Sequence, residues 1–442
     1  MEKDQNLDKS SGDVKFQSPT SLQVGLLTED LTGMETNFES NTLSAKAQTA
    51  YQIDSKLNQL SFFAFGVSLL LPWNAIIAAM DYFNAIYPNH QPSFTFLVAV
   101  SVPMLLMQIV CFLLRGQISL HISLTMALAV NTVLTLLTAI IPQVIDDEDT
   151  SYAIMMVMTF IFGSMIAFLQ TSCYGVAGVS MKLTTMLMVG VGISSISMNV
   201  LRMIFLALVS NYAAGQIVFF SISGAYLFAC FFLSILFLRD YDNYQKQQYH
   251  ESLINNSEIR QGSLVASTKS QNRKNMLLKA WQVYKINYPY GLSVVLTFAI
   301  YYTFFPGVML KKKLDFIDSF AWFANGIITL HNVCDTIGRT LAGRWIIVNK
   351  KNYPYVCLIR LIFVITYCFF FFGVAPQFFQ NDAWVIIQVI LFSLSCGYLA
   401  SLGMYYGSDK ECGDQGLGGA IMSFNLTLGI CLGSVFAIAC FS

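Results

Sequence analysis

About eleven apolar segments, each close to the length of a membrane-spanning helix, follow one another from residue 57 onward. They cover approximately 57–80, 94–114, 119–142, 152–174, 184–210, 215–238, 287–309, 318–347, 354–373, 383–406 and 416–440. About 20 apolar residues are needed for a helix to cross the hydrocarbon core of a bilayer. A helix also satisfies its backbone polar groups internally, which lipid demands. No short alternating strands of a membrane barrel are visible. The sequence therefore predicts an all-α, polytopic membrane protein with about eleven transmembrane helices.

The composition agrees with a surface that mostly faces lipid. Hydrophobic residues make up 55% of the chain and charged residues 11%, whereas soluble domains have about 25% charged residues. The net charge of zero gives no reason to expect nucleic-acid binding. The ten cysteines show no CxxC or Cys/His spacing, so we expect no metal site and no disulfide framework. No cofactor and no obligate protein partner are indicated.

Polar stretches divide the chain into four parts. Residues 1–56 are polar and are predicted to be a disordered cytoplasmic tail. Six helices follow in 57–238, a polar and basic loop in 239–286, and five helices in 287–442. We expect a 6+5 bundle resembling the major facilitator fold, because a polar hinge between two helical halves suits a carrier that rocks about a central site.

The distribution of basic residues predicts the orientation in the membrane. Cytoplasmic loops carry an excess of Lys and Arg. Basic residues concentrate in the loops on one side of the predicted membrane. Lys311–Lys313 are the exception, because they fall in a loop on the opposite side. The prediction is a cytoplasmic N-terminus, an extracellular C-terminus and a place in the plasma membrane, with an endomembrane left open. The basic residues on the predicted cytoplasmic side are Lys46, Lys56, Arg115, Lys182, Arg344, Lys350 and Lys351, together with those of the large loop.

Three ionisable residues interrupt the eighth apolar segment. His331, Asp335 and Arg339 are four residues apart, so they share one helix face. A charge in the bilayer costs several kcal/mol unless it is paired or hydrated. Asp335 and Arg339 form a pair that either locks helices together or faces a watery cavity and binds a polar solute. His331 is either a satisfied buried residue or a pH-sensitive group.

Other intramembrane polar residues have similar alternatives. Gln170 offers an amide that donates and accepts hydrogen bonds, which suits the edge of a heterocyclic base or an interhelical contact. Arg202 is as compatible with a tie between helices as with substrate contact. Trp73 follows Pro72 and is suited to stacking on an aromatic solute or to a membrane-interface belt.

Several enzyme and motor signatures are missing from the sequence. There is no GxxxxGK[ST] phosphate loop and no HExxH metalloprotease motif. No nucleophile–base set is evident, so an enzyme is not expected.

Taken in order, several short motifs resemble the equilibrative nucleoside transporters (solute carrier family 29). They are LPWNAIIAAMDYF (71–83), FLQTSCYGVAG (168–178), FFPGV (304–308), NVCDTIGR (332–339), NDAWVI (381–386), GYLASL (397–402) and GGAIMSFNLTLGICLGS (418–434). The likeness covers nearly all of 60–438. It implies facilitated transport of nucleosides, and in some members nucleobases, by alternating access through a bilayer.

The resemblance also implies roles by position. Trp73 and Leu70 would wall the site, Gln170 would bind the base, and Asp335 and Arg339 would bind the ribose, with Asn332 on the same helix and Phe305 and Met104 as apolar lining. Arg202 resembles an arginine of protist and plant members and is a candidate substrate or gating residue, as is His331.

Two departures from the family leave details open. The family often reads Asp-Trp-Leu-Gly-Arg, but Thr336 and Ile337 follow Asp335 here. His331 stands where the family usually has an apolar aromatic residue. Substrate preference and proton coupling therefore stay open.

Rival interpretations are a sugar or other small-solute carrier and a non-transporting, receptor-like lysosomal or endomembrane protein. The first would show twelve helices and GxxxD[RK]-like loops, which are not found. Loss of Gln170 or of the Asp335–Arg339 pair would favour the second, and all three residues are present.

Overall fold

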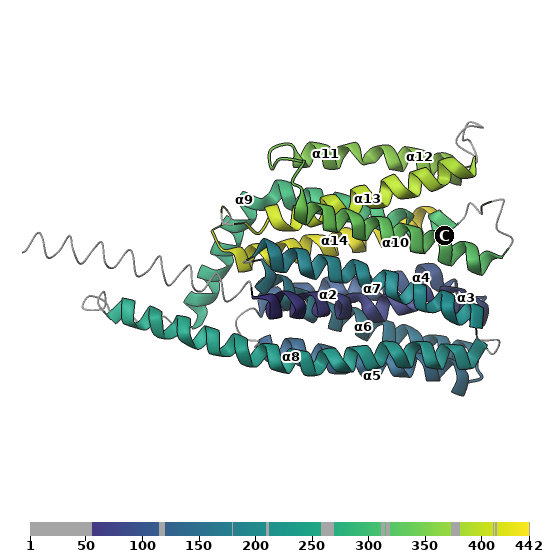
Figure 1. The fold of residues 1–442 in the computed structure, drawn as a ribbon, viewed down its shortest axis with the longest axis horizontal. Helices are drawn as coiled ribbons and strands as arrows, with labels where there is room; N and C mark the ends of the chain where they lie inside the picture. The colour runs from purple at the N-terminus through teal and green to yellow at the C-terminus, as the bar shows by residue number, and fades with distance from the viewer. Residues whose placement is uncertain are drawn as a thin grey trace, which may run out of the picture. The chain divides into compact units, whose positions relative to one another are not determined.

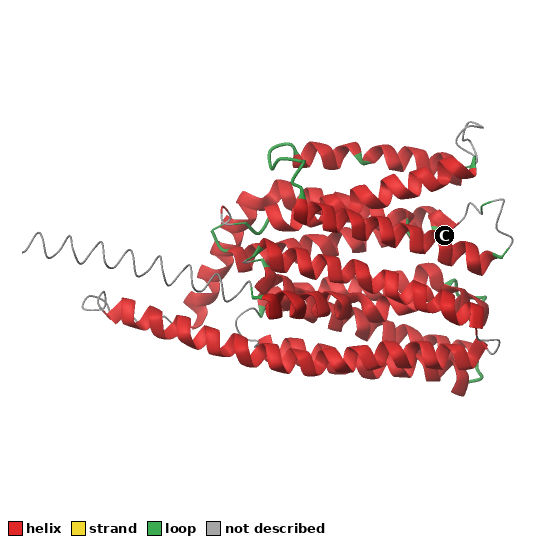
Figure 2. Ribbon diagram, viewed as in Figure 1, coloured by secondary structure: helices red, strands yellow, loops and turns green. Residues whose placement is uncertain are grey.

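The structure is a computed structural model that describes residues 55–114, 120–178, 180–208, 212–257, 269–310, 314, 319–372, 381–409, 411 and 413–441. Within these ranges every regular element is a helix (Figures 1 and 2). The α-helices are α2 (Lys56–Ala78), α3 (Met80–Ile86), α4 (Pro92–Leu113), α5 (Leu120–Val144), α6 (Glu148–Ala177), α7 (Met181–Leu208), α8 (Tyr212–Ser257), α9 (Lys269–Phe304), α10 (Phe320–Arg344), α11 (Tyr353–Ile359), α12 (Leu361–Phe371), α13 (Asp382–Tyr406) and α14 (Gln415–Phe441). A 3₁₀ turn, η1 (Val308–Leu310), follows α9.

The helices confirm the all-α, polytopic membrane fold, although hydropathy does not establish the predicted number of eleven. Nine of the described helices are long and apolar enough to cross a bilayer. Helix α10 is not among them, and it carries Asp335, Arg339 and Arg344. Helices α11 and α12 divide the predicted ninth segment, with Arg360 between them. Figure 1 shows α10, α11 and α12 running alongside the longer helices.

Two helical groups make up the described chain. Helices α2 to α8 form the first bundle, in which α2 packs on α7, α4 on α6 and α5 on α8. Helices α9 to α14 form the second bundle, in which α9 packs on α14 and α10 on α13. The bundles meet where α7 contacts α10 and where α14 contacts α4 and α6.

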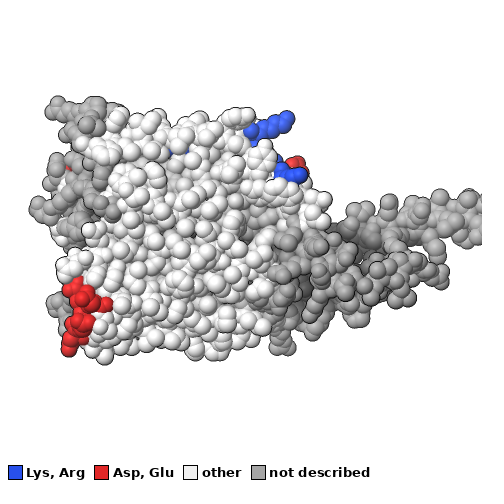
Figure 3. All heavy atoms as spheres, turned by 180° about the vertical axis from the view of Figure 1, so that it is seen from behind, with Lys and Arg blue, Asp and Glu red and all other residues white. Residues whose placement is uncertain are grey.

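The two ends of the helices differ in charge, as Figure 3 shows for one face. The helices alternate in direction, so the start of α2, the α6–α7 loop and the end of α10 lie at one end. We call this the basic end, because it carries Lys56, Lys182 and Arg344. The opposite, acidic end carries Asp146–Asp149. Arg115 and Lys311–Lys313, which entered the orientation argument, lie outside the described residues.

A close approach of backbones fixes α10 against α13. A Cβ atom added at Gly397 of α13 would collide with the carbonyl oxygen of Asp335 in α10. Only glycine allows this approach, because the other residues carry a Cβ atom. The contact holds α10 close against α13 at the level of Asp335.

The polar segment between the bundles is partly helical. Helix α8 continues to Ser257, and α9 begins at Lys269. Residues 258–268 and the tail before residue 55 lie outside the described residues. The division into a tail, two halves and a loop at 239–286 stays a prediction.

Candidate functional site

A central cavity lies between the two bundles, with a volume of about 50 Å³. Helices α2, α6 and α7 line it from the first bundle, and α9, α10 and α14 line it from the second. Seven of the residues singled out from the sequence line it. They are Leu70, Trp73, Gln170, Phe305, Asn332, Asp335 and Arg339.

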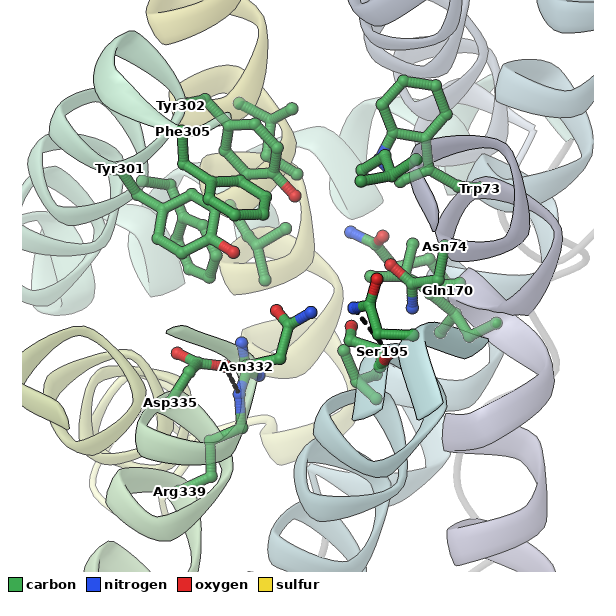
Figure 4. A pocket seen from close by; sticks show the side chains of 18 of the residues that line it. Trp73, Asn74, Gln170, Ser195, Tyr301, Tyr302, Phe305, Asn332, Asp335 and Arg339 are labelled. Atoms are coloured by element: carbon green, nitrogen blue, oxygen red, sulfur yellow. Dashed lines mark hydrogen bonds and ion pairs between the residues drawn. The ribbon is translucent and has the colours of Figure 1, made fainter. Parts of the chain in front are cut away.

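The acid–base pair lies on α10 at the edge of this cavity (Figure 4). Arg339 Nε donates to Asp335 Oδ2 at 2.6 Å, and both side chains are buried. The four-residue spacing brings them onto one helix face. Asp335 Oδ1 has no hydrogen-bond partner among the described residues. This oxygen lies beside Gly397 of α13, because a Cβ atom built there would be 3.0 Å from it.

Amide and hydroxyl groups lie across the cavity from this pair. Figure 4 shows Asn332 of α10 facing the side formed by Gln170, Asn74 and Ser195. Asn74 donates to Ser194 Oγ at 3.0 Å, which holds α2 against α7. Asn74 and Ser195 line the cavity, and the sequence analysis missed both. Asn74 stands between a tryptophan and an alanine, and Ser195 follows Ser194. No spacing in the sequence sets them apart from other small polar residues in membrane helices.

Aromatic rings form another wall of the cavity. Tyr301 and Tyr302 of α9, together with Phe305, lie opposite Trp73 of α2 (Figure 4). The ring centroids of Tyr301 and Phe305 are 5.2 Å apart. Such faces suit a flat, unsaturated ring, because aromatic groups stack favourably. The two tyrosines were also missed, although the aromatic run before Pro306 is a signal that could have found them.

Two of the predicted residues lie away from the cavity lining. Met104 of α4 is buried but is not among the residues that line the central cavity. Arg202 of α7 forms an ion pair with Asp81 of α3 at 2.6 Å, with both side chains buried. In this structure Arg202 therefore links helices near the acidic end and does not line the central cavity.

His331 lies behind the aromatic wall. Its ring stacks on Phe305, with centroids 4.3 Å apart and an interplanar angle of 17°. Its Nδ1 is hydrogen-bonded to the hydroxyl of Ser393 on α13. The ring does not line the cavity, but it contacts Phe305, which does.

A second cavity, here named the vestibule, lies closer to the acidic end and has a volume of about 330 Å³. Asp81 and Asn84 line it from the first bundle, and Asn325 lines it from the second. Ile77 lines both cavities, so the vestibule adjoins the central cavity.

Toward the basic end, by contrast, α10 packs on α7 at Gly343 and Thr185. Helix α14 packs on α6 at Gly419 and Tyr174.

Comparisons with known proteins match the chain to nucleoside and nucleotide transporters. Residues 154–440 match the family described as "Nucleoside transporter". The chain is 27% identical to human equilibrative nucleoside transporter 1, over 86% of this chain and 95% of that protein. It is 22% identical to equilibrative nucleotide transporter 8 of Arabidopsis thaliana, over 84% of this chain and 92% of that protein.

The fold is also similar to that of a solved transporter. The structure of a major facilitator superfamily proton:xylose symporter, bound to 6-bromo-6-deoxy-D-glucose, matches with a TM-score of 0.59. The identity is 12%, over 87% of this chain and 89% of that chain. This likeness shows the fold alone.

Proposed function

This chain belongs to the nucleoside transporter family and is a nucleoside transmembrane transporter, and we propose that its central cavity is the substrate site of an alternating-access mechanism. The observation that carries the proposal is the position of this cavity between the two bundles. Residues from both bundles line it. A site shared by two halves is exposed to either side when the halves rock against each other.

The chemistry of the walls fits the two parts of a nucleoside. The base is a flat heterocycle. Once the bundles move apart and enlarge the cavity of about 50 Å³, Trp73 and Tyr302 can sandwich this base and Gln170 can bond at its edge. The sugar carries hydroxyls, which can donate to the Asp335 carboxylate and accept from Arg339. A nucleobase has no sugar, so it would leave Asp335 and Arg339 without a substrate contact. We therefore propose nucleosides as the principal substrates.

We propose facilitated diffusion as the mode of transport, with the substrate chemically unchanged. The chain has no phosphate loop for ATP hydrolysis. The direction of flow is then set by the nucleoside gradient.

The charge difference between the ends supports an orientation. Lys182 and Arg344 lie at the basic end, which we propose is cytoplasmic. The vestibule would then open toward the outside, and the C-terminus would be extracellular. A plasma-membrane location fits uptake through this vestibule.

Uptake in cells that lack their own nucleoside carriers tests the proposal. Labelled adenosine, uridine, hypoxanthine and xylose would be supplied separately to cells producing the chain and to cells carrying the empty vector. We expect saturable uptake of at least one nucleoside, and no uptake of xylose. Xylose uptake alone would favour the sugar-carrier rival. No uptake at normal abundance would favour a non-transporting protein.

A further inference from the structure

A buried polar network crosses the interface between the bundles on one side of the central cavity. Gln108 of α4 donates through Nε2 to Ser423 Oγ of α14 at 3.0 Å. Gln170 of α6 directs its Nε2 at Ser423 Oγ (3.2 Å), Ser423 O (3.3 Å) and Thr427 Oγ1 (3.0 Å). All four side chains are almost fully buried. We name these four residues the amide latch.

The latch lies at the edge of the cavity that is nearer the basic end, with Gln170 in the cavity lining and Ser423 about one turn closer to the basic end than Leu426. Helix α14 begins at Gln415 at the basic end. Along it, Ser423 comes before Leu426 and Ile430, which line the cavity. The latch therefore joins the bundles on the side that must separate when the cavity opens toward the basic end.

Gln170 belongs to both the latch and the cavity lining. A glutamine amide carries two N–H donors and one carbonyl acceptor. The donors face Ser423 and Thr427, whereas Oε1 makes no hydrogen bond with any described residue. A base edge with a donor beside an acceptor pairs with a glutamine amide through both Oε1 and Nε2. Such pairing uses the Nε2 donors of Gln170, which in this structure donate to Ser423 and Thr427.

We propose that the base of a bound nucleoside weakens the amide latch by taking the Nε2 donors of Gln170 away from α14, which leaves the bond from Gln108 to Ser423 as the remaining link. The inference rests on the proposed function. The loaded carrier then opens toward the basic end more readily than the empty one, in which the latch stays closed. Ser423 and Thr427 are positioning residues, because they contact Gln170 directly. Gln108 is a positioning residue through its bond to Ser423.

The latch has a kinetic consequence. If the empty carrier reorients slowly, exchange of nucleoside across a membrane is faster than net flow, because exchange avoids the empty step. Removing the acceptors on α14 should speed the empty step roughly two- to tenfold, the range that corresponds to one net hydrogen bond. The advantage of exchange over net flow should then largely disappear.

The full chain in proteoliposomes tests this consequence, with labelled adenosine or uridine, whichever the wild type carries faster. The ratio of maximal exchange to maximal net flow is measured for wild type, Ser423→Ala/Thr427→Val and Ser434→Ala. We expect a ratio above one for the wild type and close to one for the double variant. Ser434→Ala is the matched control, because Ser434 is buried on the same helix and its hydroxyl bonds to Ile430 O of that helix. It should keep the wild-type ratio.

Gln108→Leu provides a second test from the first bundle, and it serves if the double variant does not fold. It should also lower the ratio. A wild-type ratio of one, or latch variants that lose abundance or stability but keep the wild-type ratio, would overturn the latch. Failure of the wild type to carry any nucleoside would overturn the proposed function instead, so the two failures are distinguishable.

Discussion

The carboxylate of Asp335 has one oxygen paired with Arg339 and one without a partner among the described residues. Hydrogen bonds to charged groups contribute about 1.5–3 kcal/mol. Asp335→Asn removes the charge from the pair and weakens the acceptor offered to the sugar. We expect roughly 10- to 100-fold lower nucleoside uptake per molecule at the cell surface, measured as initial rates normalised to surface abundance.

Exchanging the two residues separates substrate contact from a structural ion pair. The double variant Asp335→Arg/Arg339→Asp keeps both charges four residues apart but moves each to the other position. Uptake should stay low in this variant, because the sugar meets a different group at each position. Recovery of wild-type uptake would show that the pair only stabilises the helices.

His331 gives a second prediction at the scale of single residues. Its ring contacts Phe305 and Ser393 and does not line the central cavity. His331→Phe restores the type of residue that is usual in the family at this position and keeps an aromatic face toward Phe305. We expect the uptake curve between pH 5.5 and 8 to keep its shape. A curve that flattens only in the variant would assign pH sensing to His331.

At the scale of elements, an ion cluster connects the loops at the basic end. Lys350 follows α10 and bonds to Asp409 at 2.6 Å and to Glu411, both in the loop before α14. Partial burial lowers the pKa of Lys350, but these bonds outweigh it and raise that pKa above its usual 10.5. The bond from Lys350 lowers the pKa of Glu411 below its usual 4.5.

These shifts set the pH range in which the cluster stabilises the fold. The contribution of Glu411 is fully present above 4.5 and is lost as the pH falls through its lowered pKa. The contribution of Lys350 is fully present below 10.5 and is lost as the pH rises through its raised pKa. The cluster should therefore stabilise the fold at neutral pH and weaken in strong acid or base.

Lys350→Met tests the cluster. At pH 7 we expect a small decrease in the unfolding temperature of the detergent-solubilised chain, because a partly exposed pair such as Lys350–Asp409 contributes less than about 1 kcal/mol. The difference from wild type should shrink below pH 4.5. Equal unfolding temperatures of the two proteins at pH 7 would mean that the cluster contributes no stability.

At the scale of the whole molecule, alternating access requires α7 and α10 to separate at the basic end. A Cβ atom added at Gly343 of α10 would lie 3.4 Å from the Cβ atom of Thr185 in α7. Disulfides span Cβ atoms about 3.5–4.5 Å apart. Oxidation of the variant Thr185→Cys/Gly343→Cys should therefore join the bundles and abolish uptake, and a reductant should restore it.

The ten native cysteines make controls necessary. Wild type and each single variant, treated with the same oxidant, should keep their uptake. A cross-linked double variant that still transports would show that α7 and α10 need not separate, and would contradict rocking at this interface.

The helices and the acid–base pair are determined by the sequence alone, for local reasons. A run of about 20 apolar residues forms a helix in lipid wherever it occurs in the chain. The Asp335–Arg339 bond follows from the four-residue spacing within α10. Trp73 and Gln170 were singled out as a ring and an amide within apolar segments, and the resemblance to the family added their roles. Both line the cavity.

Tertiary structure decided which other residues face the cavity. Tyr302 and Ser195 line it, whereas Met104 and Arg202 do not. In soluble proteins an apolar stripe reveals the buried face of a helix. In a membrane both lipid and the protein interior are apolar, so the pattern says little about how each helix is rotated. The partners of Gln170 lie more than 250 residues away on α14. Only the packing of the two bundles brings them together.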